Sequence, residues 1–426
     1  MLPFTHLRSS RETLCDGPSS DLCAKAPMPT VDNAIIAHKP TRIEGAGQRL
    51  PTLDGLRGIA ILMVLIGHFH QGHLIREYFP LLSKVISRIA SAGDIGVELF
   101  FVLSGFLITG ILLDTKDQPH SLSKFYVRRV LRIFPLYYGA LAIVLVVLPI
   151  FVPLDAPGKE IVARQGWLWV YLINFPLVPW IWDESGMFMF GHFWSLCVEE
   201  HFYLIWPWVV AAISPKRLFA LSVFVVAFAL MARWWNYVAG DATPLLIRWN
   251  TIQKIDGLAF GALIAIGIRD AGIAARFPTG KSCRFFCWLS CTLLVALAFA
   301  PKPLFHSPLF WILRGTLVIF LFGFILVAAI QAKPREVLHR CLSSRMLVAC
   351  GTYSYGLYVI HGIVRPCFTR ILDMTRMPTT GVWPLITFVG FYCFAIGVCF
   401  VLAYGSYHLF EKRFLELKRY FSYSSR

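Results

Sequence analysis

Apolar stretches of about twenty residues recur through most of this chain, separated by short basic connectors. The chain has 426 residues, of which 57% are hydrophobic and only 15% are charged. An apolar stretch of that length can cross the hydrocarbon core of a bilayer as one helix. Soluble domains of this size do not have such a composition. The sequence therefore predicts an all-α polytopic membrane protein.

The hydropathy pattern divides the chain into a membrane domain and two tails. Residues 1–50 are rich in Ser, Pro, Thr and charge and lack an apolar run, so we expect a disordered tail without a signal peptide. The membrane domain is expected over 51–412, and a basic tail over 413–426. Ten transmembrane helices are expected, at 54–73, 94–113, 134–153, 192–213, 217–237, 252–268, 285–300, 308–331, 346–364 and 382–409.

The aromatic segment 165–182 decides the expected orientation. It is short and interrupted by Pro176 and Pro179, and we expect it to lie at the outer membrane interface, where Trp and Tyr settle. Most of the 40 Lys and Arg then fall on one side, which places both termini in the cytoplasm. The net charge of +16 comes from these short patches, so no nucleic-acid partner is expected.

The stretch Leu53–Phe69, LDGLRGIAILMVLIGHF, carries two ionisable side chains on one expected membrane helix. Arg57 and His68 are eleven residues apart. That is close to three helical turns, so both lie on one stripe, separated by roughly 16 Å along the axis. Ionisable groups inside membrane helices usually mark functional sites. The alternative is a structural histidine bonded to a neighbouring helix.

The basic connector after the second expected helix supplies further candidates for binding an anion. Arg129 and Arg132 are three residues apart and share a helix face, with Arg128 beside them. Guanidinium groups bind phosphates through two parallel hydrogen bonds. Together with Arg57, they favour an anionic ligand that enters from the cytoplasm. Positive-inside anchoring is the alternative, above all for Arg128.

Carboxylates and small residues complete the candidate site. Glu199, beside Glu200, shares a face with Ser195 and Tyr203, and we expect it to orient His68 or balance its charge. A structural, hydrogen-bonded acid is the alternative. Ser104 and Gly105 are small enough to admit a slender ligand or another helix backbone.

Several residues are expected to support the site or the acceptor. They are Trp194, Ser195, Tyr203, Asp256 and His361, and for Asp256 and His361 a structural role is the main expectation. The three histidines in HFHQGH, residues 68–73, do not share one helix face and have no suitably spaced carboxylate. The eleven cysteines show no metal-like pairs. No metal site is therefore expected.

Five motifs in this order resemble the acyltransferase-3 family of integral membrane acyltransferases: LDGLRGIAILMVLIGH, FFVLSGFLIT, FYVRRVLRIFPLYY, FWSLCVEEHFYLIWP and YSYGLYVIH. The resemblance covers roughly residues 50–415. It implies ten helices in the plasma membrane, in bacteria the inner membrane. It also implies transfer of an acyl group, usually acetyl, from cytoplasmic acyl-CoA to a hydroxyl of a sugar, polysaccharide or glycolipid precursor.

The family motifs fall on residues already singled out. The Arg-x10-His pair of the family falls on Arg57 and His68, its Arg-x-x-Arg on Arg129 and Arg132, and its helix-four acid on Glu199. The depth pattern agrees with this, because arginines at the inner mouth would hold the phosphates of CoA while the thin arm runs past Ser104 toward His68.

Two hypotheses follow for function. In the first, the protein is an acyl-CoA-dependent O-acyltransferase in which His68 is the general base; an acyl-histidine intermediate stays open. In the second, the protein is a proton-coupled transporter or polysaccharide-export component without acyl transfer. The oligomeric state is not indicated by the sequence. Lack of an internal repeat and the cytoplasmic arginines favour the enzyme.

Overall fold

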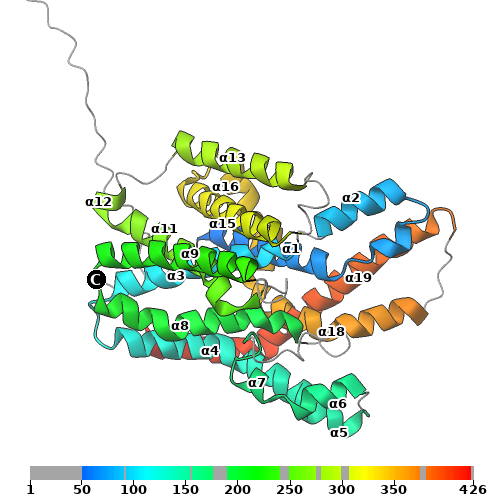
Figure 1. Ribbon diagram of the computed structural model, residues 1–426. Helices are drawn as coiled ribbons and strands as arrows, with labels where there is room; N and C mark the ends of the chain where they lie inside the picture. The colour runs from blue at the N-terminus through cyan, green and yellow to red at the C-terminus, as the bar shows by residue number, and fades with distance from the viewer. Residues whose placement is uncertain are drawn as a thin grey trace, which may run out of the picture. The chain divides into compact units, whose positions relative to one another are not determined.

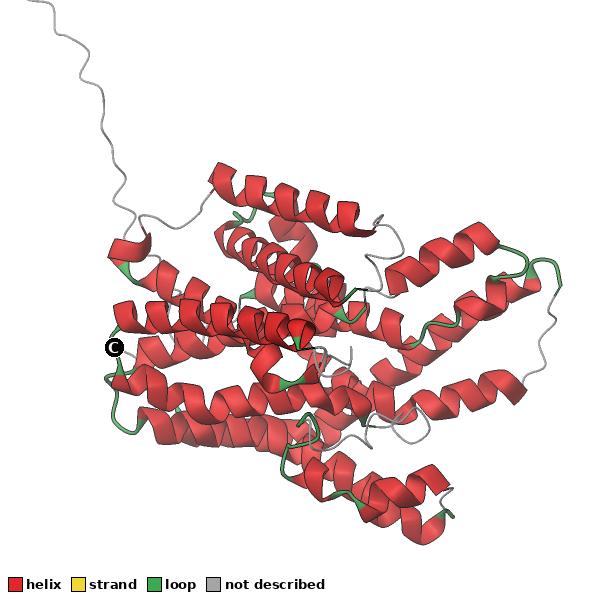
Figure 2. Ribbon diagram, in the orientation of Figure 1, coloured by secondary structure: helices red, strands yellow, loops and turns green. Residues whose placement is uncertain are grey.

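The computed structural model describes residues 50–90, 93–153, 156–175, 190–239, 249–274, 280–298, 307–374 and 380–423. The chain divides into two units, 1–39 and 40–426, and all described residues belong to the second. The expected N-terminal tail, residues 1–50, thus lies outside the described residues, apart from Leu50. All regular elements in the described ranges are helices (Figure 2), as the apolar pattern predicts.

The longer helices correspond to the expected apolar segments (Figure 1). They are α1 (Pro51–His68), α3 (Ile95–Thr115), α4 (Ser121–Leu141), α8 (Trp194–Ala212), α9 (Pro215–Val238), α11 (Thr251–Arg269), α13 (Gly280–Ala298), α15 (Pro308–Gln331), α18 (Ser354–Met374) and α19 (Trp383–Ser406). The shorter helices are α2 (Pro80–Ala90), α5 (Leu148–Phe151), α6 (Ala156–Ala163), α7 (Gly166–Trp169), α12 (Ala271–Ala274), α16 (Val337–Leu342), α17 (Arg345–Thr352) and α20 (Lys412–Glu416).

Fewer helices than expected are long and apolar enough to cross a membrane. Within the described part of the chain there are seven, or eight if the pair α17 and α18, bent by 68°, forms one span. Helix α8 is not among the seven, and the apolar part of α13 is short, Ser282–Leu297. Segment 165–175 contains only the four-residue α7, and its remainder lies outside the described residues. Ten spans and cytoplasmic termini therefore stay predictions.

Helix α4 begins thirteen residues before the expected start at residue 134. Its sequence has no helix breaker before Pro135, and the helix continues through that proline into a π-helical segment, Ala142–Val147. The arginines of the basic connector consequently lie inside a helix rather than ahead of one. Arg129 and Arg132 therefore share one face of this helix, as their three-residue spacing predicted.

Helix α1 ends at His68 rather than at residue 73. A 3-10 turn, Gly72–Ile75, follows, and α2 packs against this turn. The Ser83 hydroxyl donates to the Gly72 carbonyl at 2.8 Å, and the Ser87 hydroxyl lies 3.0 Å from the His70 ring. Because α2 supplies these partners, the polar sequence after His68 leaves the helix, and His68 occupies its C-terminal end.

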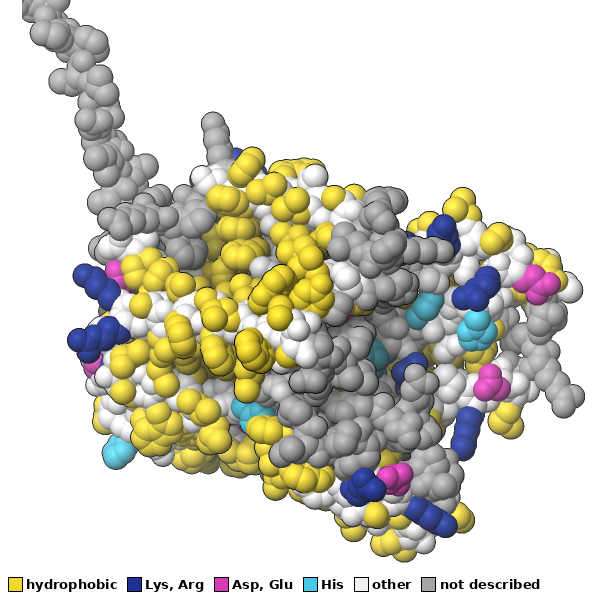
Figure 3. All heavy atoms as spheres, viewed as in Figure 1, with side chains coloured by type: hydrophobic (Ala, Val, Ile, Leu, Met, Phe, Trp, Pro, Cys, Tyr) yellow, Lys and Arg dark blue, Asp and Glu magenta, His cyan; other side chains and the backbone are white. Residues whose placement is uncertain are grey.

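The exposed surface is apolar where a membrane would surround it. Figure 3 shows hydrophobic side chains covering much of the described face over α9 and α15, with Lys and Arg near the helix ends. Large apolar side chains on this surface include Phe224, Met231 and Trp235 of α9 and Trp288 of α13. In water, this belt would leave a large apolar surface exposed to solvent. It therefore favours a membrane environment.

Glycines let helices α3 and α11 approach to backbone contact. A Cβ on Gly105 would lie 1.9 Å from the carbonyl oxygen of Leu258, and one on Gly261 would lie 2.1 Å from that of Val102. Small residues at membrane helix contacts allow this packing. Close packing is thus the role of Gly105, one of the two alternatives its sequence context left open.

We expect Gly105→Ala to destabilise the protein by about 1–3 kcal/mol, because the new methyl group must push α3 away from α11. Gly390→Ala on α19, where a Cβ would meet nothing within 4 Å, is the matched control. Thermal unfolding of the detergent-solubilised variants measures the difference. Equal midpoints for the two variants would contradict the close contact.

Candidate functional site

A cavity of about 80 Å³ lies among α1, α3, α4, α8 and α18, and we call it the arginine cavity. This volume exceeds that needed for one water several times over. The cavity is lined by Arg57, Val97, Phe100, Phe101, Ser104, Arg129, Arg132, Ile133, Ser195, Leu196, Glu199, Glu200, Tyr203, Ser354, Tyr355 and Tyr358. It therefore brings together seven of the twelve residues predicted from sequence.

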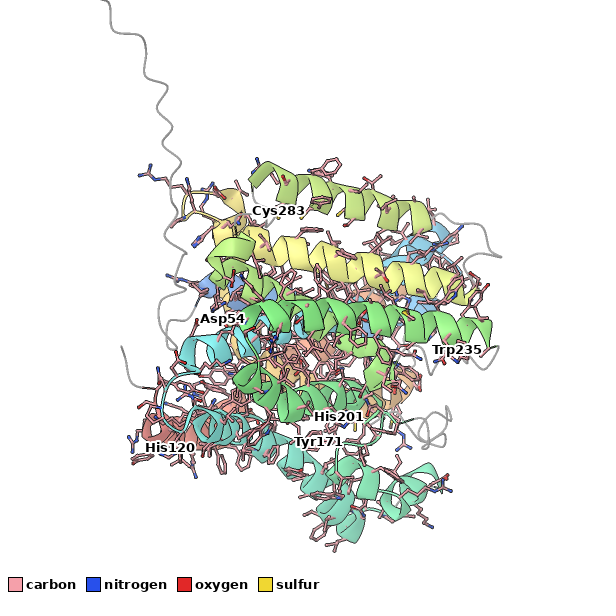
Figure 4. All side chains as sticks on the ribbon, turned by 60° about the vertical axis from the view of Figure 1, so that its left-hand side comes forward. Asp54, His120, Tyr171, His201, Trp235 and Cys283 are labelled. Carbon is pink, nitrogen blue, oxygen red and sulfur yellow. The ribbon has the colours of Figure 1, made fainter. Side chains whose placement is uncertain are left out.

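Three guanidinium groups converge on this cavity. Arg57 donates to Asp54 at 3.3 Å, and Asp54 lies within the bundle near the start of α1 (Figure 4). Arg129 stacks over the Tyr203 ring at 5.0 Å. Among the described residues, Arg129 and Arg132 form no ion pair with a carboxylate. An excess of positive charge in a confined cavity fits an anionic ligand.

Glu199 faces the arginine cavity and does not bond to His68. Its Oε1 accepts a hydrogen bond from the Ser104 hydroxyl at 2.8 Å, and its Oε2 accepts one from the Tyr203 hydroxyl at 3.0 Å. The predicted helix face that joins Glu199 to Tyr203 is present, and Ser104 joins it from α3. Glu199 is thus a partner of the cavity hydroxyls, and its expected role of orienting His68 or balancing its charge stays a prediction.

The far wall of the cavity is a hydrogen-bonded pair of hydroxyls. Ser195 Oγ lies 2.5 Å from Tyr358 Oη. Both hydroxyls also lie within reach of the backbone carbonyl of His192, at 3.3 Å for Ser195 and 2.8 Å for Tyr358, so one hydroxyl donates to this carbonyl while the other donates to its partner hydroxyl. His68 is not among the residues that line the arginine cavity. Arg57 and His68 therefore lie on one helix but are separated by this wall.

Behind the wall, three histidine rings form a cluster. The ring centroids of His68 and His361 are 4.9 Å apart, and those of His361 and His192 are 4.6 Å apart. The packing is close because α18 carries Gly362, where a Cβ would lie 2.2 Å from the His192 ring. The His192 side chain is buried, and its Nε2 lies 3.2 Å from the Val359 carbonyl.

His192 is a member of the cluster that the sequence analysis did not single out. It precedes Trp194 by two residues, in the 3-10 turn Gly191–Phe193 that leads into α8. The signal was present as an ionisable residue in an apolar segment, the same criterion that selected His68. His361, expected mainly as a structural residue, is fully buried at 0% exposure.

Backbone carbonyls define the tautomers of two of these rings. His68 Nδ1 lies 2.9 Å from the Val64 carbonyl, which can only accept, so Nδ1 carries the proton and Nε2 has a free lone pair. His361 Nδ1 likewise faces the carbonyls of Tyr358 and Leu357, at 2.7 and 3.1 Å. Within the described residues, the buried Nε2 of His361 has no hydrogen-bond partner. The cluster thus holds proton acceptors.

Other candidates lie elsewhere. Arg128 donates to the carbonyls of Lys418 and Phe421, at 3.1 and 3.3 Å, which ties α4 to the residues that follow α20. The chain from α20 to residue 421 is helical, although the sequence suggested only a basic tail. Arg128 thus has a structural role in place of a position in the cavity.

Two acceptor candidates lie on the other side of α3. Asp256 forms a buried ion pair with Arg233 of α9. Trp194 packs edge-on against Phe101 at 5.9 Å and lines a second cavity.

Tyr171 and His201 lie close together where the chain after α7 meets α8 (Figure 4). Asn174 and His201 both bond to Thr251, at 2.6 and 2.9 Å.

Residues capable of binding a metal are dispersed. In the described ranges there is no group of three His, Cys, Asp or Glu side chains placed to hold a metal ion. The rings of the histidine cluster meet edge-on or tilted, and the Nδ1 atoms of His68 and His361 are occupied by carbonyls. The described site comprises a cavity lined by three arginines and a cluster of three imidazole rings.

The curated relatives are O-acetyltransferases of bacteria. The peptidoglycan O-acetyltransferase OatA of Listeria monocytogenes is 27% identical over 77% of this chain and 51% of its own length. The O-acetyltransferase OatA of Staphylococcus aureus is 26% identical over 73% and 50%. The putative peptidoglycan O-acetyltransferase YrhL of Bacillus subtilis is 28% identical over 85% and 54%. The chain thus spans about half the length of these relatives.

No solved structure matches the chain at a significant level. The family model described as an acyltransferase domain matches residues 50–404, which include the arginine cavity and the histidine cluster. This range agrees with the extent over which the five sequence motifs resemble the family. The chain belongs to the acyltransferase-3 family.

Proposed function

We propose that the protein is a membrane O-acyltransferase that moves an acetyl group from acetyl-CoA to a hydroxyl of peptidoglycan or a related cell-surface glycan. The observation that carries this proposal is the combination of a cavity in which Arg129 and Arg132 have no carboxylate partner among the described residues with a half-buried His68 imidazole whose Nδ1 donates to a backbone carbonyl. The names of the relatives support the acetyl group and the glycan acceptor.

Acetyl-CoA would bind with its phosphates against Arg57, Arg129 and Arg132. Phosphate groups neutralise the excess positive charge of the arginine cavity, and guanidinium groups bind them bidentately. The slender arm of CoA would extend past Ser104 toward the Ser195–Tyr358 wall. The centroid of the Tyr358 ring lies 5.5 Å from that of His192 and 5.5 Å from that of His361. A rotation of the Tyr358 side chain would therefore join the arginine cavity to the histidine cluster.

His68 would act as the general base through Nε2. As it takes the proton of the acceptor hydroxyl, the hydroxyl oxygen attacks the thioester carbonyl carbon and the carbon–sulfur bond breaks. The thiolate of CoA then takes the proton from the imidazolium, which regenerates the neutral ring. In the alternative double displacement, Nε2 attacks the thioester carbonyl carbon and the CoA thiolate leaves. The acceptor hydroxyl then attacks the acyl carbon, the bond to Nε2 breaks, and the hydroxyl proton passes to the thiolate.

Supporting groups hold this arrangement. The Val64 carbonyl fixes the His68 tautomer, and Glu199 holds the Ser104 and Tyr203 hydroxyls at the cavity wall. We further propose that both termini are cytoplasmic, which gives the arginine cavity access to the cytoplasmic acyl-CoA pool. The transporter alternative is not favoured, because the curated relatives are named as O-acetyltransferases.

His68→Ala is expected to reduce acetyl transfer at least 100-fold, because general base catalysis contributes about 10²–10⁴-fold. Mass spectrometry of glycans from membranes that carry the variant, with acetyl-CoA supplied, measures product. His73→Ala, at an exposed position after α1, is the matched control and should retain activity. Acetylated product at the wild-type level in His68→Ala would overturn the assignment of the base.

Arg132→Gln is expected to raise the KM for acetyl-CoA by about 10-fold or more, because a charge-assisted contact is worth about 1.5–3 kcal/mol. The KM for the glycan should change little. Arg217→Gln, at an exposed position near the start of α9, controls for general loss of positive charge. An equal rise in both KM values, or none in either, would contradict donor binding in the arginine cavity.

A further inference from the structure

A second cavity, of about 50 Å³, is lined by residues at the start of α3 that do not line the arginine cavity. We call it the tryptophan cavity, because Trp194, Trp249 and Trp311 line it together with Asp94, Ile95, Glu98, Arg233, Lys254, Arg314, Gly315 and Val318. These residues lie at or near the starts of α3, α8, α11 and α15 and the end of α9. They therefore share one end of the bundle.

That end is the His68 end of α1. Helices α1 and α3 are antiparallel, because Gly67 near the end of α1 packs against Gly93, just before α3. A Cβ on Gly67 would lie 2.8 Å from the Gly93 Cα. Arg57, by contrast, lies near the opposite end of α1. The tryptophan cavity and the donor arginines therefore approach the centre of the protein from opposite ends.

The charges around the tryptophan cavity are balanced. Its cationic side chains each have a carboxylate partner: Arg233 with Asp256, Lys254 with Glu98, and Arg314 with Asp94 at 3.1 Å. Arg314 also stacks over the Trp311 ring at 5.3 Å. A cavity without net charge does not select an anion or a cation. It suits a neutral ligand that hydrogen-bonds to polar groups.

Two buried polar atoms of these side chains lack partners. Glu98 Oε2 and Arg233 Nε have no hydrogen bond within the described residues, although the two side chains are only 7% and 2% exposed. Leaving a buried polar atom unsatisfied costs about 1–3 kcal/mol. An acceptor and a donor that both line one cavity point to a ligand that can donate and accept, as a hydroxyl does.

We propose that the tryptophan cavity binds a neutral sugar ring of the glycan acceptor. Sugar rings present apolar C–H faces, which pack on flat indole rings, and hydroxyls, which bond to paired charged groups such as Glu98 and Arg233. This assignment rests on the proposed function, since it places the acceptor. It goes beyond it by naming where the glycan is held and by which side chains.

The position of the cavity suits delivery of a hydroxyl to the base. Trp194 in its wall follows His192 of the histidine cluster by two residues. A glycan chain held here by one sugar therefore places a neighbouring sugar beside the histidine cluster, opposite to the side from which the donor arrives.

Binding can be measured without any acyl donor. Isothermal titration of the full chain in detergent with tetra-N-acetylchitotetraose, a neutral N-acetylhexosamine chain, should give saturable heat. Trp249→Leu and Glu98→Gln should each weaken this binding at least 10-fold. Trp288→Leu, which alters an exposed tryptophan of α13, is the matched control and should bind like the wild type.

The outcomes separate this proposal from the proposed function. Absence of binding by the wild type, or unchanged binding by both cavity variants, overturns the sugar site even if acetyl transfer persists. Selective loss of binding in the cavity variants supports the site even if no acetyl transfer is found in any variant. Size-exclusion profiles show whether each variant folds. If either Trp249→Leu or Glu98→Gln does not fold, the remaining variant and Trp311→Leu test the sugar site in its place.

Discussion

The cost of burying charge among apolar helices governs the arrangement of this protein. An isolated ion inside a low-dielectric bundle is strongly unfavourable, so buried charges are paired or bind a ligand. The ion pair of Arg233 with Asp256 satisfies this requirement internally. Arg129 and Arg132 have no carboxylate among the described residues, and they line a cavity. The contrast separates charges that the fold neutralises itself from charges left for a ligand.

The same logic distinguishes the two sides of α3. One face of this helix carries Ser104 toward an electropositive cavity, and its N-terminal end carries Glu98 toward a cavity whose charges balance. Helix α8 repeats the division, with Glu199 on the first side and Trp194 on the second. A wall only two helices thick thus divides two chemically different compartments, which suits a reaction that joins a charged donor to a neutral acceptor.

Sequence periodicity predicted the helices well, because each apolar segment of about twenty residues becomes a helix. The end of α1 at His68 could not be predicted, since it depends on hydrogen bonds from α2, a helix with little local signal. The start of α4 was placed too late because hydropathy marks lipid contact, whereas Lys124 and Arg128 extend the same helix beyond it. The number of membrane spans stays a prediction.

The sequence predicted which residues form the candidate site better than it predicted which of them contact one another. Arginine spacing and the Ser195–Glu199–Tyr203 face identified residues that do meet in one cavity. The expected link from Glu199 to His68 was not found, because helix spacing gives the face of a residue but not the partner it meets across the bundle. His192 reaches the cluster from a non-regular turn, where no periodicity applies.

The packing of the histidine cluster depends on the absence of a side chain at Gly362. The His192 ring occupies the space that any larger residue on α18 would fill. Substitution of this glycine would therefore displace the His192 ring from the cluster without altering a single titratable group. A survey of ionisable residues alone would miss such a loss, so the position is one to inspect when judging whether a distant homologue retains working chemistry.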